Sequence, residues 1–240
     1  PARRSPDAGH PSEVSGGMNV LDLFSGIGGF SLGLERAGMR TLAFCESDPD
    51  CVSTLRRHWP DVPVFGDIRS LTVEPGFAEV FCGGFPCQPF STAARGRNNA
   101  ADLWPAYLRL VREGRPDWVC AENVPGIGHA GIERVCRGLE AEDYSVRTFD
   151  ADTALPARQR GRHRILWVAH ANGESEPRRA LDAEMAGLRP LSRHGWADEP
   201  APVGMDDVLP GRMDALHQLG NYFTPYFAEL LGRAIVRASR

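Results

Sequence analysis

Short apolar runs that alternate with segments of helical period constrain the fold of this chain more than any other feature. The alternation extends from MNVLDLF (18–24) to RILWVAH (164–170), with helical segments such as 29–39 and 103–114 between the apolar runs. Such a rhythm is typical of strands that alternate with helices. We therefore predict an α/β domain in which helices cover both faces of a parallel sheet and ligands bind where the strands end.

Composition narrows the alternatives. With 240 residues, 42% of them hydrophobic and 24% charged, the chain can bury one substantial core. Its formal net charge of -4 argues against coating nucleic acid by bulk electrostatics, although its basic residues are all arginines in local clusters. No apolar run has the length of a membrane span, and six cysteines without a C-x-x-C pair favour reduced thiols. We expect a cytoplasmic protein without a membrane segment or a metal site.

Departures from the alternation divide the chain into four parts. Residues 1–17 are predicted to be a flexible lead, and residues 18–170 carry the strand and helix pattern. Residues 171–211 are rich in Pro, Gly and charged residues, with little periodicity, which indicates a loop-dominated insertion or a minidomain. Helical spacing returns within residues 212–240, at YFAELLGRAIV, and we expect this helix to pack back on the sheet.

The first predicted turn from strand to helix is glycine-rich. In LDLFSGIGGF (21–30), Gly26, Gly28 and Gly29 leave room for a ligand to approach the backbone. A dinucleotide fingerprint would need glycine or alanine where Ser31 stands, and the chain has no phosphate-binding G-K-S/T. The turn therefore predicts a ligand held without a phosphate-binding loop.

Carboxylates follow the next two predicted strands. Glu46 can accept hydrogen bonds from both hydroxyls of a ribose, and Asp67 can accept one from an adenine amino group. A nucleoside bound in this way points to S-adenosylmethionine. The alternative is that a glycine turn and two acids merely shape a generic α/β protein.

Seven motifs occur in the order found in DNA (cytosine-5) methyltransferases, and the chain resembles that family. They are DLFSGIGG, CES, GDI, GGFPCQPFS, ENV, RGRHRILWVA and LGNYFTP. The resemblance covers most of residues 18–170 and 212–237, and the separation of PCQ from ENV makes it specific. It implies an S-adenosylmethionine-dependent methyltransferase fold, a Rossmann-like doubly wound sheet with a very small target-recognition segment at 171–211.

The resemblance makes Cys87 the catalytic nucleophile. Cytosine C5 is too poor a nucleophile to attack a methyl sulfonium unaided, and a thiolate that adds to C6 activates the ring. The prolines on both sides of Cys87 would hold its sulfur fixed and exposed. Cys82, within an apolar strand, is predicted to be a core cysteine instead.

Addition at C6 pushes electron density toward N3, and the resemblance assigns Glu122 of ENV to supply a proton or a strong donor there. Burial beside the base would keep this acid protonated at neutral pH, while Asn123 shapes the loop. The base that removes the C5 proton is not identified by the sequence.

An arginine run, RQRGRHR (158–164), departs from the family motif at one position. Its arginines recur at period two, so an extended strand places them on one face. The family motif Q-x-R-x-R aligns its arginines with Arg162 and Arg164, which would hold Glu122 and touch the target base, but places Arg160 where glutamine is expected. The alternative is a solvated basic strand edge.

The resemblance also implies contacts with the cofactor and with DNA. The cofactor contacts are Phe24, Ser25, Gly26, Gly28, Gly29, Glu46, Ser47, Asp67, Ile68, Pro86, Leu103, Asn221 and Tyr222. The DNA contacts are Gln88, Ser91, Arg95 and Arg97, of which the two arginines are equally interpretable as ordinary surface charges. The target cytosine would rotate out of the duplex into the pocket.

The C-terminal motif departs from the family pattern, because Tyr222 and Phe223 stand where a small residue and valine are usual. The bulk of these side chains either narrows the methionine end of the pocket, reshapes it for a modified S-adenosylmethionine, or packs elsewhere. We prefer unmodified S-adenosylmethionine.

Three functions follow from these patterns. The preferred one is a monomeric DNA cytosine-5 methyltransferase of bacterial or phage type that modifies double-stranded DNA at a short or degenerate site. The others are an RNA methyltransferase of the same fold and a noncatalytic module that binds S-adenosylmethionine and DNA. The biological role, restriction-modification or another, stays open at this stage.

Overall fold

The computed structural model describes residues 17–86, 102–152, 163–171, 183, 185, 189–190 and 225–239. Its strands are β1 (Asn19–Leu23), β2 (Arg40–Cys45), β3 (Val64–Phe65), β4 (Val80–Gly84), β5 (Trp118–Asn123), β6 (Ser145–Asp152), β7 (His163–His170) and β8 (Arg189–Pro190). Its helices are α1 (Gly29–Arg36), α2 (Pro49–His58), α3 (Trp104–Gly114), α4 (Gly128–Glu140) and α7 (Pro225–Ala238), with a short 3-10 helix η2 (Pro125–Ile127) before α4.

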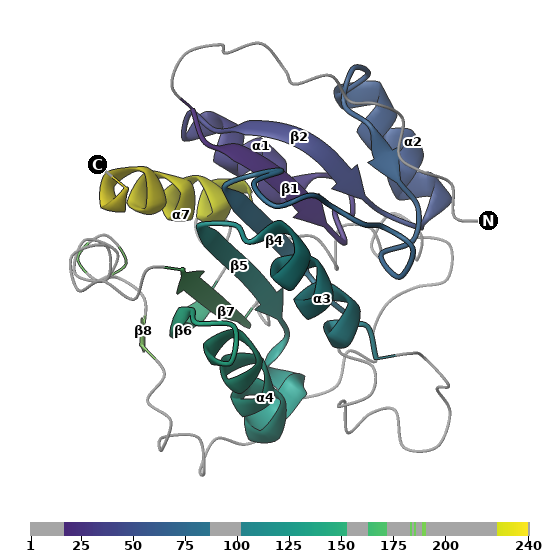
Figure 1. The fold of residues 1–240 in the computed structure, drawn as a ribbon. Helices are drawn as coiled ribbons and strands as arrows, with labels where there is room; N and C mark the ends of the chain where they lie inside the picture. Colours follow the sequence, from purple (N-terminus) through teal and green to yellow (C-terminus); the bar gives the residue numbers. More distant parts are fainter. Residues whose placement is uncertain are drawn as a thin grey trace, which may run out of the picture.

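The strands of the described residues form one sheet in the order β3-β2-β1-β4-β5-β7-β6-β8 (Figure 1). The first five strands of this order, β3, β2, β1, β4 and β5, are parallel to one another. Their carboxyl ends therefore lie at one edge of the sheet, which is where ligands bind in doubly wound proteins. The predicted α/β class is confirmed.

The prediction of a parallel sheet is wrong at β7 and β8. β7 is antiparallel to both β5 and β6, and β8 is antiparallel to β6. Only residues 153–162 connect β6 to β7, fewer than the dozen or so that a parallel crossover needs. β8 also places residues 189–190 in the sheet, within the segment 171–211 that the sequence predicts to be dominated by loops.

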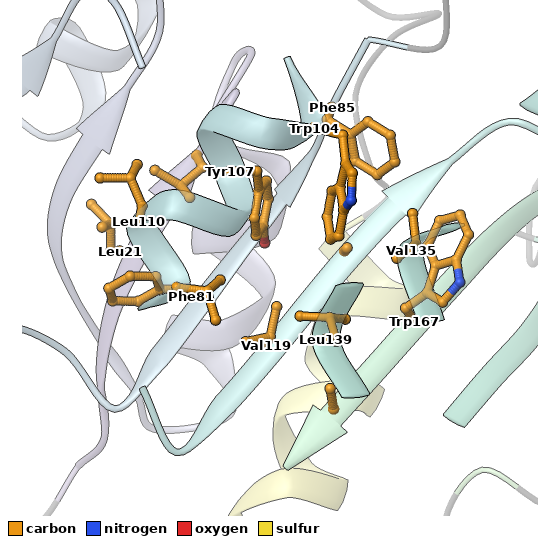
Figure 2. Packing of buried hydrophobic residues seen from close by; sticks show 14 of the residues in the cluster. Leu21, Phe81, Phe85, Trp104, Tyr107, Leu110, Val119, Val135, Leu139 and Trp167 are labelled. Atoms are coloured by element: carbon orange, nitrogen blue, oxygen red, sulfur yellow. The ribbon is translucent and has the colours of Figure 1, made fainter. Parts of the chain in front are cut away.

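Different helices cover the two faces of the sheet. Neighbouring strand residues point to opposite faces, so Leu21 belongs to the cluster under α3 and α4, whereas Val20 belongs to the cluster under α1 and α7. Figure 2 shows the first cluster, in which Trp104 and Tyr107 of α3 lie over the strands. Helices on both faces confirm the doubly wound architecture. Within the described residues, no helix is both long and apolar enough to cross a bilayer.

Asp48 followed by Pro49 is a sequence pattern that predicts the start of a helix, and the structure confirms it at α2. The Asp48 carboxylate accepts hydrogen bonds from the backbone N–H groups of Asp50 and Cys51, at 2.9 and 3.0 Å, and Pro49 occupies the first helical position. A carboxylate at this point satisfies donors that have no partner within the helix, and proline loses nothing by lacking one. α2 begins where the sequence indicates.

Helix α7 packs back on the molecule as predicted, directly against α1 (Figure 1). The two helices approach closely because Gly33 of α1 has no side chain. A Cβ atom at Gly33 would lie 2.3 Å from the Pro225 carbonyl oxygen, 2.4 Å from Ala228 Cβ and 2.7 Å from Glu229 N. The backbone of α1 therefore lies close to the backbone of α7, although the two helices are far apart in the sequence.

We expect Gly33→Ala to destabilise the protein by roughly 1–3 kcal/mol, because the new methyl group overlaps backbone atoms of α7. In an isolated helix the same change would be stabilising by about 1 kcal/mol. Chemical denaturation measures the difference. Gly138→Ala in α4 is the matched control, since its nearest new neighbour is Leu108 Cδ2 at 3.1 Å. If both variants gained stability, the close packing of α1 and α7 would be disproved.

Candidate functional site

The turns that follow the parallel strands bring together many of the residues singled out in the sequence. Phe24 to Gly29 follow β1, Glu46 and Ser47 follow β2, Asp67 and Ile68 follow β3, and Glu122 is the penultimate residue of β5. Pro86, Leu103 and Arg164 are described as well. Eight predicted site residues lie outside the described residues: Cys87, Gln88, Ser91, Arg95, Arg97, Arg162, Asn221 and Tyr222. The described residues therefore cover the predicted cofactor edge and the predicted acid, Glu122.

The glycine turn after β1 uses conformations that favour glycine. Gly26 and Gly28 have φ angles of 54° and 86°, in the left-handed region. A Cβ atom at Gly26 would have no neighbour within 4 Å among the described atoms, whereas one at Gly28 would lie 2.6 Å from the ring of Trp59. The turn is thus open at Gly26 and closed by an aromatic ring at Gly28. Gly29 is the first residue of α1.

Ser31, which breaks the dinucleotide fingerprint, has a structural partner. Its hydroxyl donates to Asp22 Oδ2 at 2.7 Å, and its backbone N–H donates to the same oxygen at 3.3 Å. Asp22 is fully buried in β1, and burial raises the pKa of its carboxyl to about 7 despite these hydrogen bonds. The pair joins the end of β1 to the first turn of α1, so a protein carboxylate meets the helix terminus where dinucleotide-binding proteins hold a phosphate.

Glu46 is bound to the backbone of two turns. Its Oε2 accepts the N–H of Gly26 at 2.7 Å, and its Oε1 accepts the N–H groups of Ser47 and Asp48 at 2.7 and 2.8 Å. Oε1 therefore has both lone pairs in use, whereas Oε2 keeps one that can accept a further hydrogen bond. The contact of Glu46 with a ribose stays a prediction.

Asp67 lies at the adjacent strand end and is partly buried. Arg69 donates to its carboxylate from the guanidinium group and from the backbone N–H, and these bonds lower the pKa of Asp67. The loop behind it is held by Arg109 of α3, whose Nη2 donates to the carbonyl oxygens of Ile68 and Leu71, both at 2.8 Å. Arg109 thereby fixes the predicted adenine side of the site.

The remaining described cofactor candidates line the same edge. Phe24 has a φ angle of 54°, unusual for a residue other than glycine, and its ring stacks on that of Tyr107 at 6.4 Å. Ser25 donates its hydroxyl to the Asp22 carbonyl at 2.7 Å. Pro86 follows β4 and Leu103 precedes α3, and both are partly buried. A strained residue at a ligand turn is typical of functional sites.

Glu122 and Arg164 form a buried ion pair at the end of β5. Arg164 Nε lies 2.7 Å from Glu122 Oε1, and each side chain is 10% exposed. Burial raises the pKa of the Glu122 carboxyl to about 7, although Arg164 opposes the shift. The prediction that Arg164 holds Glu122 is thus supported by direct contact, and the acid can carry or release a proton near neutral pH.

The chain immediately before Cys87 is fixed by two interactions that the sequence does not reveal. The Phe85 ring is buried among Trp104, Tyr107 and Trp167, with centroid distances of 5.1, 6.4 and 6.1 Å (Figure 2). The Asn123 side chain donates from Nδ2 to the Phe85 carbonyl at 2.8 Å. Residue 85 is therefore held through both its ring and its backbone.

Cys82 is a core cysteine, as predicted. Its side chain is fully buried, and burial raises the pKa of its thiol well above the ordinary value. The cysteines among the described residues form no disulfide. A buried thiol with a raised pKa cannot supply a thiolate near neutral pH.

Sequence reasoning missed Asp22, Trp59 and Arg109 altogether. Trp59 and Arg109 contact residues distant in the chain and carry no local pattern that indicates chemistry, whereas Asp22 contacts the nearby Ser31. The one available signal was Asp22, a charged residue inside an apolar strand run, which is unusual unless it is paired.

The chain is similar in sequence to known proteins. The model of the family described as C-5 cytosine-specific DNA methylase matches residues 18–193. Type II methyltransferase M.NgoMIV of Neisseria gonorrhoeae is 40% identical over 161 residues, which cover 63% of this chain and 51% of that protein. Type II methyltransferase M.HgiCII of Herpetosiphon aurantiacus is 37% identical over 141 residues, which cover 54% of this chain and 32% of that protein.

Solved structures are similar in fold. The crystal structure of the Dnmt2 methyltransferase of S. pombe superposes with a TM-score of 0.53 and 20% identity, covering 66% of this chain and 51% of that one. The matched part of the chain thus spans about half, or less, of the length of these proteins.

The raised pKa of Glu122 predicts a pH dependence of stability. In the unfolded chain the Glu122 carboxyl has a pKa of 4.5, and below this pH it is protonated in both states and does not lower the free energy of unfolding. As the pH rises toward about 7, stability is lost because the carboxyl ionises in the unfolded chain while burial keeps it protonated in the folded one. We expect this loss to reach roughly 3 kcal/mol between pH 4.5 and 8. Glu122→Gln should remove it.

Chemical denaturation of the parent and of Glu122→Gln between pH 4.5 and 8 measures the difference. Asp22 also titrates in this range, but it is present in both proteins and cancels in the comparison. Equal slopes in the two proteins would show that Glu122 is not a buried acid.

Proposed function

The chain belongs to the C-5 cytosine-specific DNA methylase family, and on this premise we propose that it transfers a methyl group from S-adenosylmethionine to C5 of cytosine in double-stranded DNA. The observation that carries the proposal is the buried Glu122–Arg164 pair, because a protonatable acid beside the strand that leads to Cys87 is what activation of a cytosine ring requires. The relatives named Type II methyltransferases fit this activity.

The cofactor edge fits an adenosine group. A Cβ atom at Gly26 would meet no described atom within 4 Å, Glu46 Oε2 accepts the N–H of Gly26, and 44% of the Asp67 side chain is exposed at the adjacent strand end. Glu46 would accept a hydrogen bond from the ribose through Oε2, and Asp67 would accept one from the adenine amino group. When bound, S-adenosylmethionine supplies an electrophilic methyl group.

The protein's own groups would carry the remaining chemistry. The Cys87 thiolate adds to C6 of the cytosine while Glu122 donates a proton toward N3, so that C5 becomes nucleophilic and can be methylated. A base then removes the C5 proton, the Cys87 thiolate leaves C6, and the N3 proton returns to Glu122, which restores the ring and the acid. Arg164 keeps Glu122 in place through this sequence.

The target base must leave the duplex to reach these groups. Gln88, Ser91, Arg95 and Arg97 follow the nucleophile, and we propose that they contact the opened DNA. Residues 171–211 are the segment in which we expect sequence recognition, while Asn221 and Tyr222 would complete the cofactor pocket.

We expect Cys87→Ser to abolish methyl transfer and to prevent a covalent adduct with duplex DNA that contains 5-fluorocytosine, since fluorine cannot leave C5 as a proton does. The test uses labelled S-adenosylmethionine, long duplexes of random sequence, and denaturing gels. Cys82→Ser is the matched control, because Cys82 is a buried core thiol, and it should retain both signals. Transfer by Cys87→Ser at the parent rate would refute the mechanism, and transfer to tRNA in place of DNA would refute the substrate.

Glu46→Ala is expected to weaken the binding of S-adenosylmethionine roughly 10- to 100-fold, because it removes charge-assisted hydrogen bonds worth about 1.5–3 kcal/mol. Isothermal titration calorimetry measures the affinity. Asp61→Ala, in the exposed turn after α2, removes the same charge at a distance from the strand ends and should bind as the parent does. Equal affinities in the parent and Glu46→Ala would contradict the assignment of the ribose site.

A further inference from the structure

We propose that Gly84 is a positioning residue for Glu122: the missing side chain at residue 84 provides the space that the Glu122 carboxylate occupies. The inference deepens the proposed function, since it concerns the acid of that reaction. It gives the second glycine of GGFPCQPFS a role that is separate from the flexibility of a turn.

The two residues are direct neighbours in the sheet. Gly84 ends β4, and Glu122 is its partner in the parallel pairing of β4 with β5. A Cβ atom at Gly84 would lie 2.4 Å from Glu122 Oε2, 3.6 Å from Glu122 Cδ and 3.9 Å from Glu122 Cβ. Such a distance to Oε2 is too short for a stable contact, so any side chain at residue 84 would displace the carboxylate.

Backbone conformation does not explain the glycine. Gly83 has a φ angle of 151°, which side chains rarely adopt, whereas Gly84 is not among the glycines with positive φ. An alanine at residue 84 would therefore fit the backbone. What the glycine contributes is space, and the group that fills this space is Glu122.

The carboxylate is also fixed on its other side. Arg164 Nε contacts Oε1 at 2.7 Å, so Glu122 lies between the bare backbone of β4 and a guanidinium group from β7. Among the described residues, Arg164 is the charged group that lowers the pKa of Glu122, against the effect of burial. A carboxylate pushed away from β4 must change its contact with Arg164, its burial, or both. Misplacement of a catalytic group by about 1 Å can cost about 100-fold in rate.

The first test is Gly84→Ala, compared with Glu122→Gln and with Gly114→Ala. Gly114 is a matched steric control, because a Cβ atom there would lie 2.4 Å from Phe81 Cζ, the same overlap but with a core ring. We expect Gly84→Ala to lose the part of the pH dependence of unfolding that Glu122→Gln loses, whereas Gly114→Ala loses stability but keeps the parent's pH dependence.

A double variant distinguishes overlap with Glu122 from a general defect. In the Glu122→Ala background the carboxylate is gone, so adding Gly84→Ala should change stability no further. This comparison also holds if Gly84→Ala alone folds poorly. An equal loss in both backgrounds, or a parental pH dependence in Gly84→Ala, would overturn the inference.

The second test measures the rate of adduct formation with 5-fluorocytosine DNA. We expect Gly84→Ala to react roughly 10- to 100-fold more slowly than the parent, with little further loss when combined with Glu122→Gln. A parental rate in Gly84→Ala would overturn the inference. If the parent itself forms no adduct, the proposed function fails, while the unfolding experiments still decide the role of Gly84.

Discussion

The buried contact between Arg164 and Glu122 depends on the direction of a single strand. β7 is antiparallel to β5, so its first residues lie at the edge of the sheet where β4 and β5 end. Arg164 is the second residue of β7 and therefore meets Glu122. If β7 were parallel, Arg164 would lie near the opposite edge, about 20 Å away at 3.3 Å per residue. The reversal of one strand thus gathers the acid, its cation and the route to Cys87 at one place.

A second constraint separates this cofactor edge from that of dinucleotide-binding proteins. Such proteins point free backbone N–H groups of the first turn and helix at a phosphate. Here Asp22 accepts the N–H of Ser31, and Glu46 accepts that of Gly26. Carboxylates at both places disfavour a second anion, and they leave Glu46 oriented toward a neutral group such as a ribose. Ser31, which breaks the dinucleotide fingerprint, therefore helps to hold the Asp22 side chain where a phosphate would otherwise bind.

Local sequence patterns predicted the helices and strands of this chain better than they predicted which of these elements contact one another. The alternation of strands and helices, the cap at Asp48 and the burial of Cys82 follow from patterns within a few residues, and the structure confirms them. The direction of β7 depends on the length of a connection and on pairing across the sheet, which periodicity does not reveal. The hydrogen bonds from Asn123 to Phe85 and from Arg109 to Ile68 join residues about forty positions apart. Only the fold brings such residues together, so the sequence identified Glu122 and Arg164 but not the hydrogen bonds that fix the strand and the loops around them.

The two hydrophobic clusters on the faces of the sheet support different parts of the predicted site. The cluster with α3 and α4 contains Phe85 and so holds the strand that leads to Cys87. The cluster with α1 and α7 contains Phe30 and Leu34, in the helix that begins at the glycine turn. Because Gly33 lets α7 contact the backbone of α1, the C-terminal helix supports the cofactor turn although more than 180 residues separate them in the sequence. The central strands β1, β4 and β5 contribute to both clusters, and this shared sheet keeps the cofactor turn and the acid in a fixed relation.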